Sequence, residues 1–269
     1  MPTIPRSSDH RDYQRVPRTV TAMARDEEHG VSGTPHSHER AQLLYATQGV
    51  MRVHTETGLW ILPPRRALWI PPGVVHHWTA LSKVTMRTIY IEPGVAAAFG
   101  DSCRVIEVSS LLRELILALL NEPIEYAIPG RGEHLAMLIL SELKAAETIP
   151  IAIPWPHDRR LVAVCSAILA DPGSSRNIEQ WADDVGASAR TLIRLFPKET
   201  GLHYRQWVQQ VHLAEAFNRL AHGRSVGEIA AALGYASPSA FSAMFRRILG
   251  KTPQHYLTEW RQPLTLHPA

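Results

Sequence analysis

The sequence feature that most constrains the fold is an internal repeat near the C-terminus. Residues 181–207, WADDVGASARTLIRLFPKETGLHYRQW, align with residues 229–256, IAAALGYASPSAFSAMFRRILGKTPQHY, at an offset of 48–49 residues. In each copy a short helical pattern ends at a glycine, a serine then caps a second helix, and that helix ends at another glycine. Helix, tight turn and helix form the helix-turn-helix layout, so the repeat predicts two such units.

A helical wheel of the second helix in the first unit places Leu192, Leu195 and Phe196 on one side and Arg190 and Arg194 on the opposite side. A single outward arginine is usually only solvated, but outward arginines recur in both copies of the repeat. Arginine can donate two hydrogen bonds to the O6 and N7 atoms of guanine in the major groove. We therefore predict that this helix reads DNA sequence.

The second helix of the second unit has an outward face that is small and polar at its start and basic at its end. Such a face favours contacts with phosphates and with DNA shape. The predicted DNA-binding residues of the two units are the caps and the outward positions: Ser188, Arg190, Thr191, Arg194, Lys198, Ser237, Ser239, Ser242, Arg246 and Arg247.

The segment between the two units, HYRQWVQQVHLAEAFNRLAHG, predicts a helix of about 19 residues, which would be about 28 Å long. One turn of DNA is about 34 Å, so such a helix can space two reading helices along one face of the duplex. Residues 1–150 hold 15 Lys/Arg and 16 Asp/Glu, whereas the remainder holds 13 and 9. This basic excess suits an anionic partner.

Residues 159–260 resemble the DNA-binding domain of AraC/XylS-type transcriptional regulators. The segment SVGEIAAALGYASPSAFSAMFRRILGKTPQHY in the second unit and LIRLFPKETG in the first carry the resemblance. The resemblance implies a sequence-specific regulator that binds double-stranded promoter or operator DNA, and it implies a homodimer. Ala243 departs from the pattern, because family members often have a polar or basic residue there.

Short segments rich in β-branched and aromatic residues, broken by Gly and Pro, run from Thr19 to Glu92 and predict a barrel or sandwich. Helical patterns follow over residues 109–121 and 131–147, and the three prolines of IPIAIPWPHD predict a linker. The predicted parts are a loose arm (1–18), a barrel with appended helices (19–148), the linker (149–158), the DNA-binding domain (159–260) and a tail (261–269).

Three histidines and a glutamine form a candidate site in the barrel. His36 and His38 lie two residues apart, so on a strand both face the same side, and His76 follows a Pro-Pro-Gly turn. Imidazoles that converge with the amide oxygen of Gln42 suit a divalent transition metal such as Zn, Ni, Mn or Fe. The same side chains could instead line a pocket for an organic ligand or make ordinary hydrogen bonds.

These motifs resemble the cupin barrel over residues 19–94, with Gln42 where metal-binding cupins have a glutamate. The resemblance implies an α+β chain in which a cupin-like effector domain, bound to a small molecule or a metal, controls an all-α domain with two helix-turn-helix units. The alternative is a cupin metalloenzyme of the dioxygenase or isomerase type with a helical appendage. Gln42 argues against that alternative, and we find no nucleophile motif and predict no catalytic residue.

The rest of the composition excludes several classes of protein. The two cysteines, Cys103 and Cys165, exclude a disulfide framework and an all-cysteine zinc site. No window approaches the roughly 18 consecutive apolar residues of a membrane span, and the polar start lacks the apolar core of a secretory signal. We therefore expect a cytoplasmic protein without a membrane partner.

Overall fold

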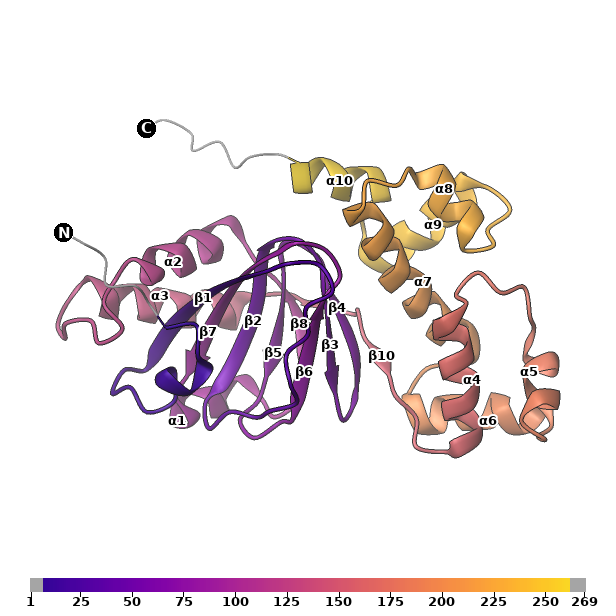
Figure 1. Ribbon diagram of the computed structural model, residues 1–269, viewed down its shortest axis with the longest axis horizontal. Coiled ribbons are helices and arrows are strands. Elements are labelled where there is room, and N and C mark those ends of the chain that lie inside the picture. Colours follow the sequence, from indigo (N-terminus) through magenta and orange to yellow (C-terminus); the bar gives the residue numbers. More distant parts are fainter. Residues whose placement is uncertain (1–6, 262–269) are drawn as a thin grey trace. The chain divides into compact units, whose positions relative to one another are not determined.

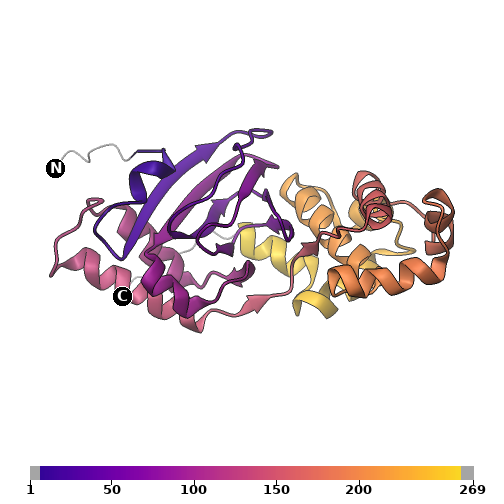
Figure 2. The same cartoon turned by 90° about the horizontal axis from the view of Figure 1, so that it is seen from below.

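The computed structural model describes residues 7–261, which form two compact units (Figures 1 and 2). The N-terminal unit comprises residues up to 56 and residues 60–149, and the C-terminal unit comprises residues 57–59 and residues from 150 onward. The predicted α+β fold, with strands in the N-terminal part and helices in the C-terminal part, is confirmed. The outer residues of the predicted arm and tail, 1–6 and 262–269, lie outside the described residues.

The strands form a six-stranded sheet in the order β1-β7-β2-β5-β8-β9 and a four-stranded sheet in the order β10-β4-β3-β6. All neighbours in the six-stranded sheet are antiparallel. The bounds of the strands are β1 Val20–Glu27, β2 Ala41–Gln48, β3 Met51–Thr55, β4 Gly58–Leu62, β5 Arg66–Ile70, β6 His76–Ala80, β7 Val84–Ile91, β8 Arg104–Glu107, β9 Thr148–Ile149 and β10 Ile153–Pro154.

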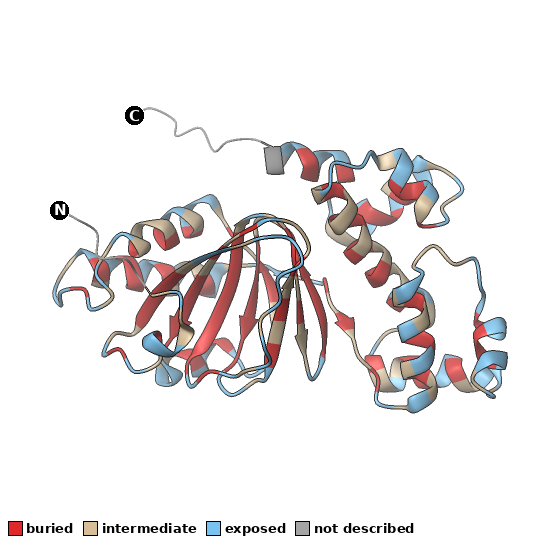
Figure 3. Ribbon diagram, viewed as in Figure 1, coloured by how far each residue is buried: buried red, intermediate tan, exposed pale blue. Residues whose placement is uncertain are grey.

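Two amphipathic helices, α2 (Ser110–Leu120) and α3 (Arg131–Ala145), cover one face of the six-stranded sheet. Much of the strand surface is buried (Figure 3), and Leu43 and Tyr45 of β2 belong to the buried cluster that these helices share with the sheet. Because successive side chains of a strand point to opposite faces, Gln42 points away from the helices. The shorter α1 (Pro93–Ala96) and η2 (Ala97–Phe99) follow β7.

The segment before β1 is packed against the barrel. Residues His10–Tyr13 form the 3-10 helix η1, and the side chain of Tyr13 is fully buried. The hydroxyl group of Tyr13 donates a hydrogen bond of 2.6 Å to the carbonyl oxygen of Ser7. The prediction of a loose arm is therefore wrong for residues 7–18, because an aromatic anchor with a satisfied hydroxyl holds them.

The Pro-rich segment predicted as a linker takes part in both sheets. Ile149 pairs with Val105 of β8, and Ile153 pairs with Leu59 of β4. Ile151 and Ile153 are buried. The prolines keep the chain extended as expected, but the isoleucines between them add sheet pairing and buried surface that the prediction omitted.

The C-terminal unit contains both predicted helix-turn-helix units. In each unit the turn contains a glycine with positive φ, Gly186 at 62° and Gly234 at 73°, a conformation that other residues adopt only with strain. Ser188 and Ser237 cap the second helices by accepting hydrogen bonds from the backbone N–H groups of Thr191 and Ala240. The helices are α4 Arg159–Ala170, α5 Ile178–Asp184, α6 Ala189–Thr200, α7 Tyr204–Ala221, α8 Val226–Ala232, α9 Pro238–Leu249 and α10 Pro253–Arg261.

Within residues 7–261, no helix combines the length and the apolar character that crossing a membrane requires.

Candidate functional site

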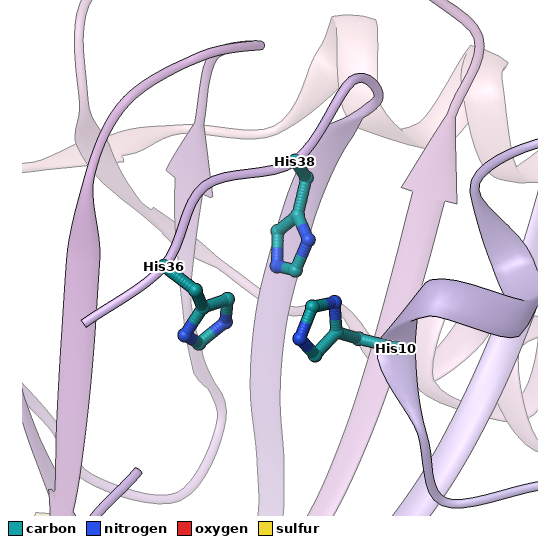
Figure 4. A group of neighbouring side chains, drawn as sticks. All are labelled: His10, His36 and His38. Carbon is teal, nitrogen blue, oxygen red and sulfur yellow. The ribbon is translucent and has the colours of Figure 1, made fainter. Parts of the chain in front are cut away.

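Four histidines converge inside the N-terminal unit, and we call them the histidine cluster: His10, His36, His38 and His76. His36 and His76 form an isolated antiparallel bridge with backbone hydrogen bonds of 3.0 and 2.9 Å. The ring centroid of His36 lies 4.8 Å from that of His38 and 4.6 Å from that of His76. The predicted convergence of three histidines is thus present, and His10 joins them from η1 (Figure 4).

Backbone carbonyls fix the orientation of two of these rings. The Nδ1 atom of His36 lies 2.7 Å from the carbonyl oxygen of Thr34, and Nδ1 of His76 lies 3.0 Å from that of Val74. A carbonyl oxygen can only accept, so each Nδ1–H donates, and in a neutral ring the lone pair is then on Nε2. Such a bond on the other ring nitrogen is typical of a metal-ligating histidine.

Several polar atoms around the histidine cluster are buried without a hydrogen bond of normal geometry. They include Nδ1 of His10, both ring nitrogens of His38 and Nε2 of His76. The side chain of Gln42 lies against both His38 and Tyr90, but its amide oxygen and the hydroxyl of Tyr90 also lack a hydrogen bond of normal geometry. A buried polar atom left without a partner costs about 1–3 kcal/mol, so this concentration points to a missing ligand.

The electrostatic surroundings keep the inner imidazoles neutral. Burial, with the neighbouring His76, His36 and His10 in support, lowers the pKa of His38 to about 3. Burial likewise lowers the pKa of His76 to about 4. Both rings therefore carry lone pairs at neutral pH, which is the state that binds a metal. The residues present thus fit the transition metal that a cupin-type site implies.

A buried arginine attaches the N-terminal segment to the barrel. The guanidinium group of Arg40, which is 5% exposed, donates hydrogen bonds to the carbonyl oxygens of Gln14, Val16 and Arg18. The backbone N–H of Arg40 donates to the side chain of Gln14 as well. These contacts place the segment that carries His10 beside His36, His38 and His76.

A cavity of about 650 Å³ adjoins the histidine cluster. This volume lies within the range of small-molecule sites, roughly 300–1,000 Å³. The residues His10, His36 and Gln42 form part of its polar lining. Its apolar and aromatic lining comes from Met23, Trp78, Met86 and Tyr90.

The outward face of α6 is basic and has an exposed apolar residue at its centre. Arg190, Arg194 and Lys198 are exposed, whereas Leu192 is buried. Ile193 lies between the two arginines in sequence and is 52% exposed. An apolar side chain at such a position can contact the methyl group of thymine.

The outward face of α9 is exposed at Ser239, Ala243, Arg246 and Arg247, and Ser242 is half-buried. A shallow hollow of about 350 Å³ lies along this face and is lined by Pro238, Ser239, Ser242, Ala243, Arg246 and Thr252. A face with small side chains at its start and two cations at its end allows close approach of a phosphate backbone.

Four arginines of the C-terminal unit outside these two faces form ion pairs. The arginines that pair with acidic side chains there are Arg160, Arg176, Arg219 and Arg224. In the described part of the chain, no salt bridge involves the cations of the α6 and α9 faces. Their charges are thus available to an anionic partner.

The long helix α7 connects the two helix-turn-helix units. Its 18 residues correspond to a length of about 27 Å, close to the predicted 28 Å. The ring of His212 in α7 lies 2.9 Å from the carbonyl oxygen of Pro172, before the first unit, and 2.9 Å from the hydroxyl of Tyr235, in the turn of the second. Because the carbonyl accepts, Nε2–H donates to Pro172 and Nδ1 accepts from Tyr235.

Two residues of these sites were not predicted from the sequence. His10 falls in the segment predicted as a loose arm, and no spacing relates it to the other histidines. Ile193 is outward on the same helical wheel that identified Arg190 and Arg194, so helical periodicity is the signal that locates it.

Comparisons with known proteins agree with this division of the chain. A model described as a helix-turn-helix domain matches residues 181–259, and a model of an AraC-like ligand binding domain matches residues 20–139. The HTH-type transcriptional regulator NimR of Escherichia coli (strain K12) is 33% identical over 222 residues, which are 82% of this chain and 81% of NimR.

Two further matches are more limited. The HTH-type transcriptional regulator RipA of Corynebacterium glutamicum is 34% identical over 105 residues, covering 39% of this chain and 32% of RipA. The crystal structure of ToxT from Vibrio cholerae covers 91% of this chain and all of ToxT at 12% identity, with a TM-score of 0.40.

Proposed function

Because this chain belongs to the AraC family of transcriptional regulators, we propose that it reads specific DNA sequences through α6 and α9 under the control of an effector held in its N-terminal barrel. The family members it matches are DNA-binding regulators, not enzymes. The coarse function, a DNA-binding transcriptional regulator with a ligand-binding domain, follows from the matches alone. The residues that contact DNA and the nature of the effector are the proposal.

One observation carries the DNA-binding part of the proposal. The same helix-turn-helix arrangement occurs twice, and each copy presents exposed cations that pair with no acidic side chain in the described residues. In the first copy Arg190 and Arg194 flank the exposed Ile193, which suits base readout. In the second copy the small residues followed by Arg246 and Arg247 suit phosphate contacts.

The effector part rests on the cavity beside the histidine cluster. Its mixture of aromatic, apolar and unpartnered polar groups suits a small organic molecule, and its imidazoles suit a divalent transition metal. Binding there would shift the populations of conformations that differ in the placement of the DNA-binding units. Regulation would then consist of changing which DNA half-sites can be contacted together.

A homodimer in the cytoplasm completes the proposal. The helices α2 and α3 expose apolar side chains, with Leu111 54%, Met137 63% and Leu138 49% exposed. Exposed apolar groups close together in one layer are typical of an interaction surface. Sedimentation of the wild type and of Met137→Glu tests this point, with the variant expected to be monomeric at concentrations where the wild type is dimeric.

Selection of bound sequences from a random library of double-stranded DNA tests the proposed function. Full-length protein is expected to enrich a two-part site, whereas Arg190→Ala/Arg194→Ala is expected to enrich none. Equal enrichment by both proteins would remove the assigned role of α6. The same selection with and without candidate effectors then measures the control by the barrel.

A further inference from the structure

We propose that His10 is a metal ligand, which together with His36 and His38 binds one divalent transition metal, with His76 beside them as a fourth imidazole. The inference rests on the proposed function, because it specifies what the effector domain binds. It adds to the predicted site a ligand from the segment before the barrel, outside the cupin-like motifs. The metal would then hold that segment to the barrel.

The geometry of the three imidazoles is close to that of a metal site. One ring nitrogen from each of His10, His36 and His38 lies within 4.8 Å of the other two (Figure 4). Nitrogen ligands about 2.1 Å from one ion are at most roughly 4.2 Å apart, so a slight rotation of the rings brings the three together. The ring of His10 stacks on that of His36 with centroids 4.5 Å apart and lies 4.7 Å from that of His38.

Hydrogen bonding engages only part of the ring nitrogens of the histidine cluster, since Nδ1 of His36 and of His76 bond backbone carbonyls and His38 lies against the side chain of Gln42. Nδ1 of His10 and both nitrogens of the buried His38 lack a hydrogen bond of normal geometry. Nε2 of His76 is equally without a partner, although its residue is 1% exposed. The four imidazoles do not form hydrogen bonds of normal geometry with one another, whereas a metal ion can accept a lone pair from each.

The position of His10 is built into the fold and is not an accident of a loose end. On one side of His10, Asp9 caps η1 by accepting a hydrogen bond from the backbone N–H of Arg11. On the other side, Tyr13 is fully buried, and the guanidinium group of Arg40 binds three carbonyl oxygens of the residues that follow. These anchors hold the His10 ring against His36.

The donor set indicates the class of metal. All the candidate ligands are imidazoles, and the neighbouring Gln42 supplies an amide in place of a carboxylate. Imidazole ligands suit Zn²⁺, Ni²⁺ and Co²⁺, whereas Mn²⁺ prefers carboxylate oxygen. We therefore expect the site to favour the first three ions over Mn²⁺.

Titration of the untagged, chelator-stripped full-length protein with Co²⁺, followed by visible absorption, tests the inference. The wild type is expected to bind one ion per chain. His10→Ala is expected to weaken binding by about 10- to 100-fold, the loss that follows even when a supporting residue is removed. His134→Ala, which removes an exposed histidine of α3, is the matched control and is expected to bind like the wild type.

Hydrogen exchange of residues 7–18 supplies a second measurement, because Zn²⁺ would not change the exchange rate of this segment if His10 had only a structural role. Zn²⁺ is expected to slow exchange in this segment of the wild type and of His134→Ala, but not of His10→Ala. No metal binding by the wild type would overturn the inference, as would equal affinities of the wild type and His10→Ala. Exchange that is insensitive to Zn²⁺ would overturn it too.

Failure of this inference and failure of the proposed function give different results. Protein that enriches a DNA sequence but binds no Co²⁺ would overturn the metal site and leave the regulator proposal intact. Protein that binds Co²⁺ through His10 but enriches no DNA would support the metal site and contradict the proposed DNA contacts.

Discussion

The guanidinium group of Arg40 donates a hydrogen bond of 2.6 Å to the carbonyl oxygen of Val16, and it also binds the carbonyl oxygens of Gln14 and Arg18. Hydrogen bonds from a charged donor contribute about 1.5–3 kcal/mol each when their geometry is good. Water can replace part of this network once the side chain is removed. We therefore predict that Arg40→Ala lowers the free energy of unfolding by about 2–3 kcal/mol.

Urea denaturation of the full-length protein measures this effect. Arg15→Ala is the control, because Arg15 belongs to the same segment but its side chain is 86% exposed and pairs only with the exposed Glu39. That control is expected to change the free energy of unfolding by less than about 0.5 kcal/mol. Equal stability of the two variants would contradict the anchoring role of Arg40.

Arg190 and Arg194 are predicted to read bases. Replacing either by alanine is expected to cost about 1–3 kcal/mol of specific binding and to relax the preference at one base pair of the selected site. Fluorescence anisotropy with the selected duplex and with single-base variants measures both effects. Arg131→Ala in α3 removes one positive charge from the N-terminal unit as a control, and an equal loss in that variant would rule out base readout by α6.

Ile193 is predicted to contact a thymine methyl group. Replacing the contacted thymine by uracil removes one methyl group and is expected to weaken wild-type binding by about 0.8 kcal/mol. The same replacement is expected to have no effect on Ile193→Ala, because the two changes remove the same contact. Additive losses across the four combinations of protein and DNA would show that Ile193 and the methyl group do not interact.

Arg246 is predicted to contact a phosphate. Arg246→Ala is therefore expected to weaken binding to the selected site and to unrelated DNA alike. The slope of log K against log salt concentration is expected to fall in magnitude by about 1, because one fewer counterion is released. Titrations between 50 and 200 mM salt check this, and an unchanged slope would exclude the phosphate contact.

His212 is predicted to make the stability of the C-terminal unit depend on pH. Burial lowers its pKa below the ordinary 6.5, so the unfolded chain binds a proton more readily than the fold does. Its contribution is complete above pH 6.5 and is lost as the pH falls from 6.5 towards the lowered pKa, by up to about 1.4 kcal/mol per pH unit.

Denaturant unfolding of the full-length wild type and of His212→Asn over this pH range isolates the contribution of His212. The difference in stability between the two proteins is expected to be constant above pH 7 and to shrink below pH 6.5. A difference that is independent of pH would mean that His212 remains equally protonated in both states.

The features that could be predicted from the sequence are those encoded by neighbouring residues. The two helix-turn-helix units follow from glycines, capping serines and helical periodicity, each of which acts within a few residues. The convergence of His36, His38 and His76 was predicted from strand alternation and a Pro-Pro-Gly turn, but in the structure only His76 lies in a strand, and His36 joins it through an isolated bridge. The overall fold could thus be predicted from local signals in the sequence, and the three histidines do lie together as expected.

The position of His10 could not be predicted from the sequence, because it depends on contacts between residues that are far apart in the chain. Arg40 binds carbonyl oxygens 22 to 26 residues earlier, and carbonyl oxygens are present at every residue. No side-chain pattern therefore identifies the acceptor. The buried pairing of Ile153 with Leu59 is a second long-range interaction, and it explains why a proline-rich linker was predicted where short strands form.

The bonds of His212 to Pro172, before the first helix-turn-helix unit, and to Tyr235, in the turn of the second, have a consequence for the DNA that this protein would recognise. Because α7 is one continuous helix and its His212 bonds both Pro172 and Tyr235, we expect α6 and α9 to keep one phase relative to the double helix. Inserting one base pair between the two parts of a site turns the distal part by about 34°, a rotation that a continuous α7 would not absorb. We therefore expect the number of base pairs between the two contacted parts of an operator to be constrained as strictly as the contacted bases themselves.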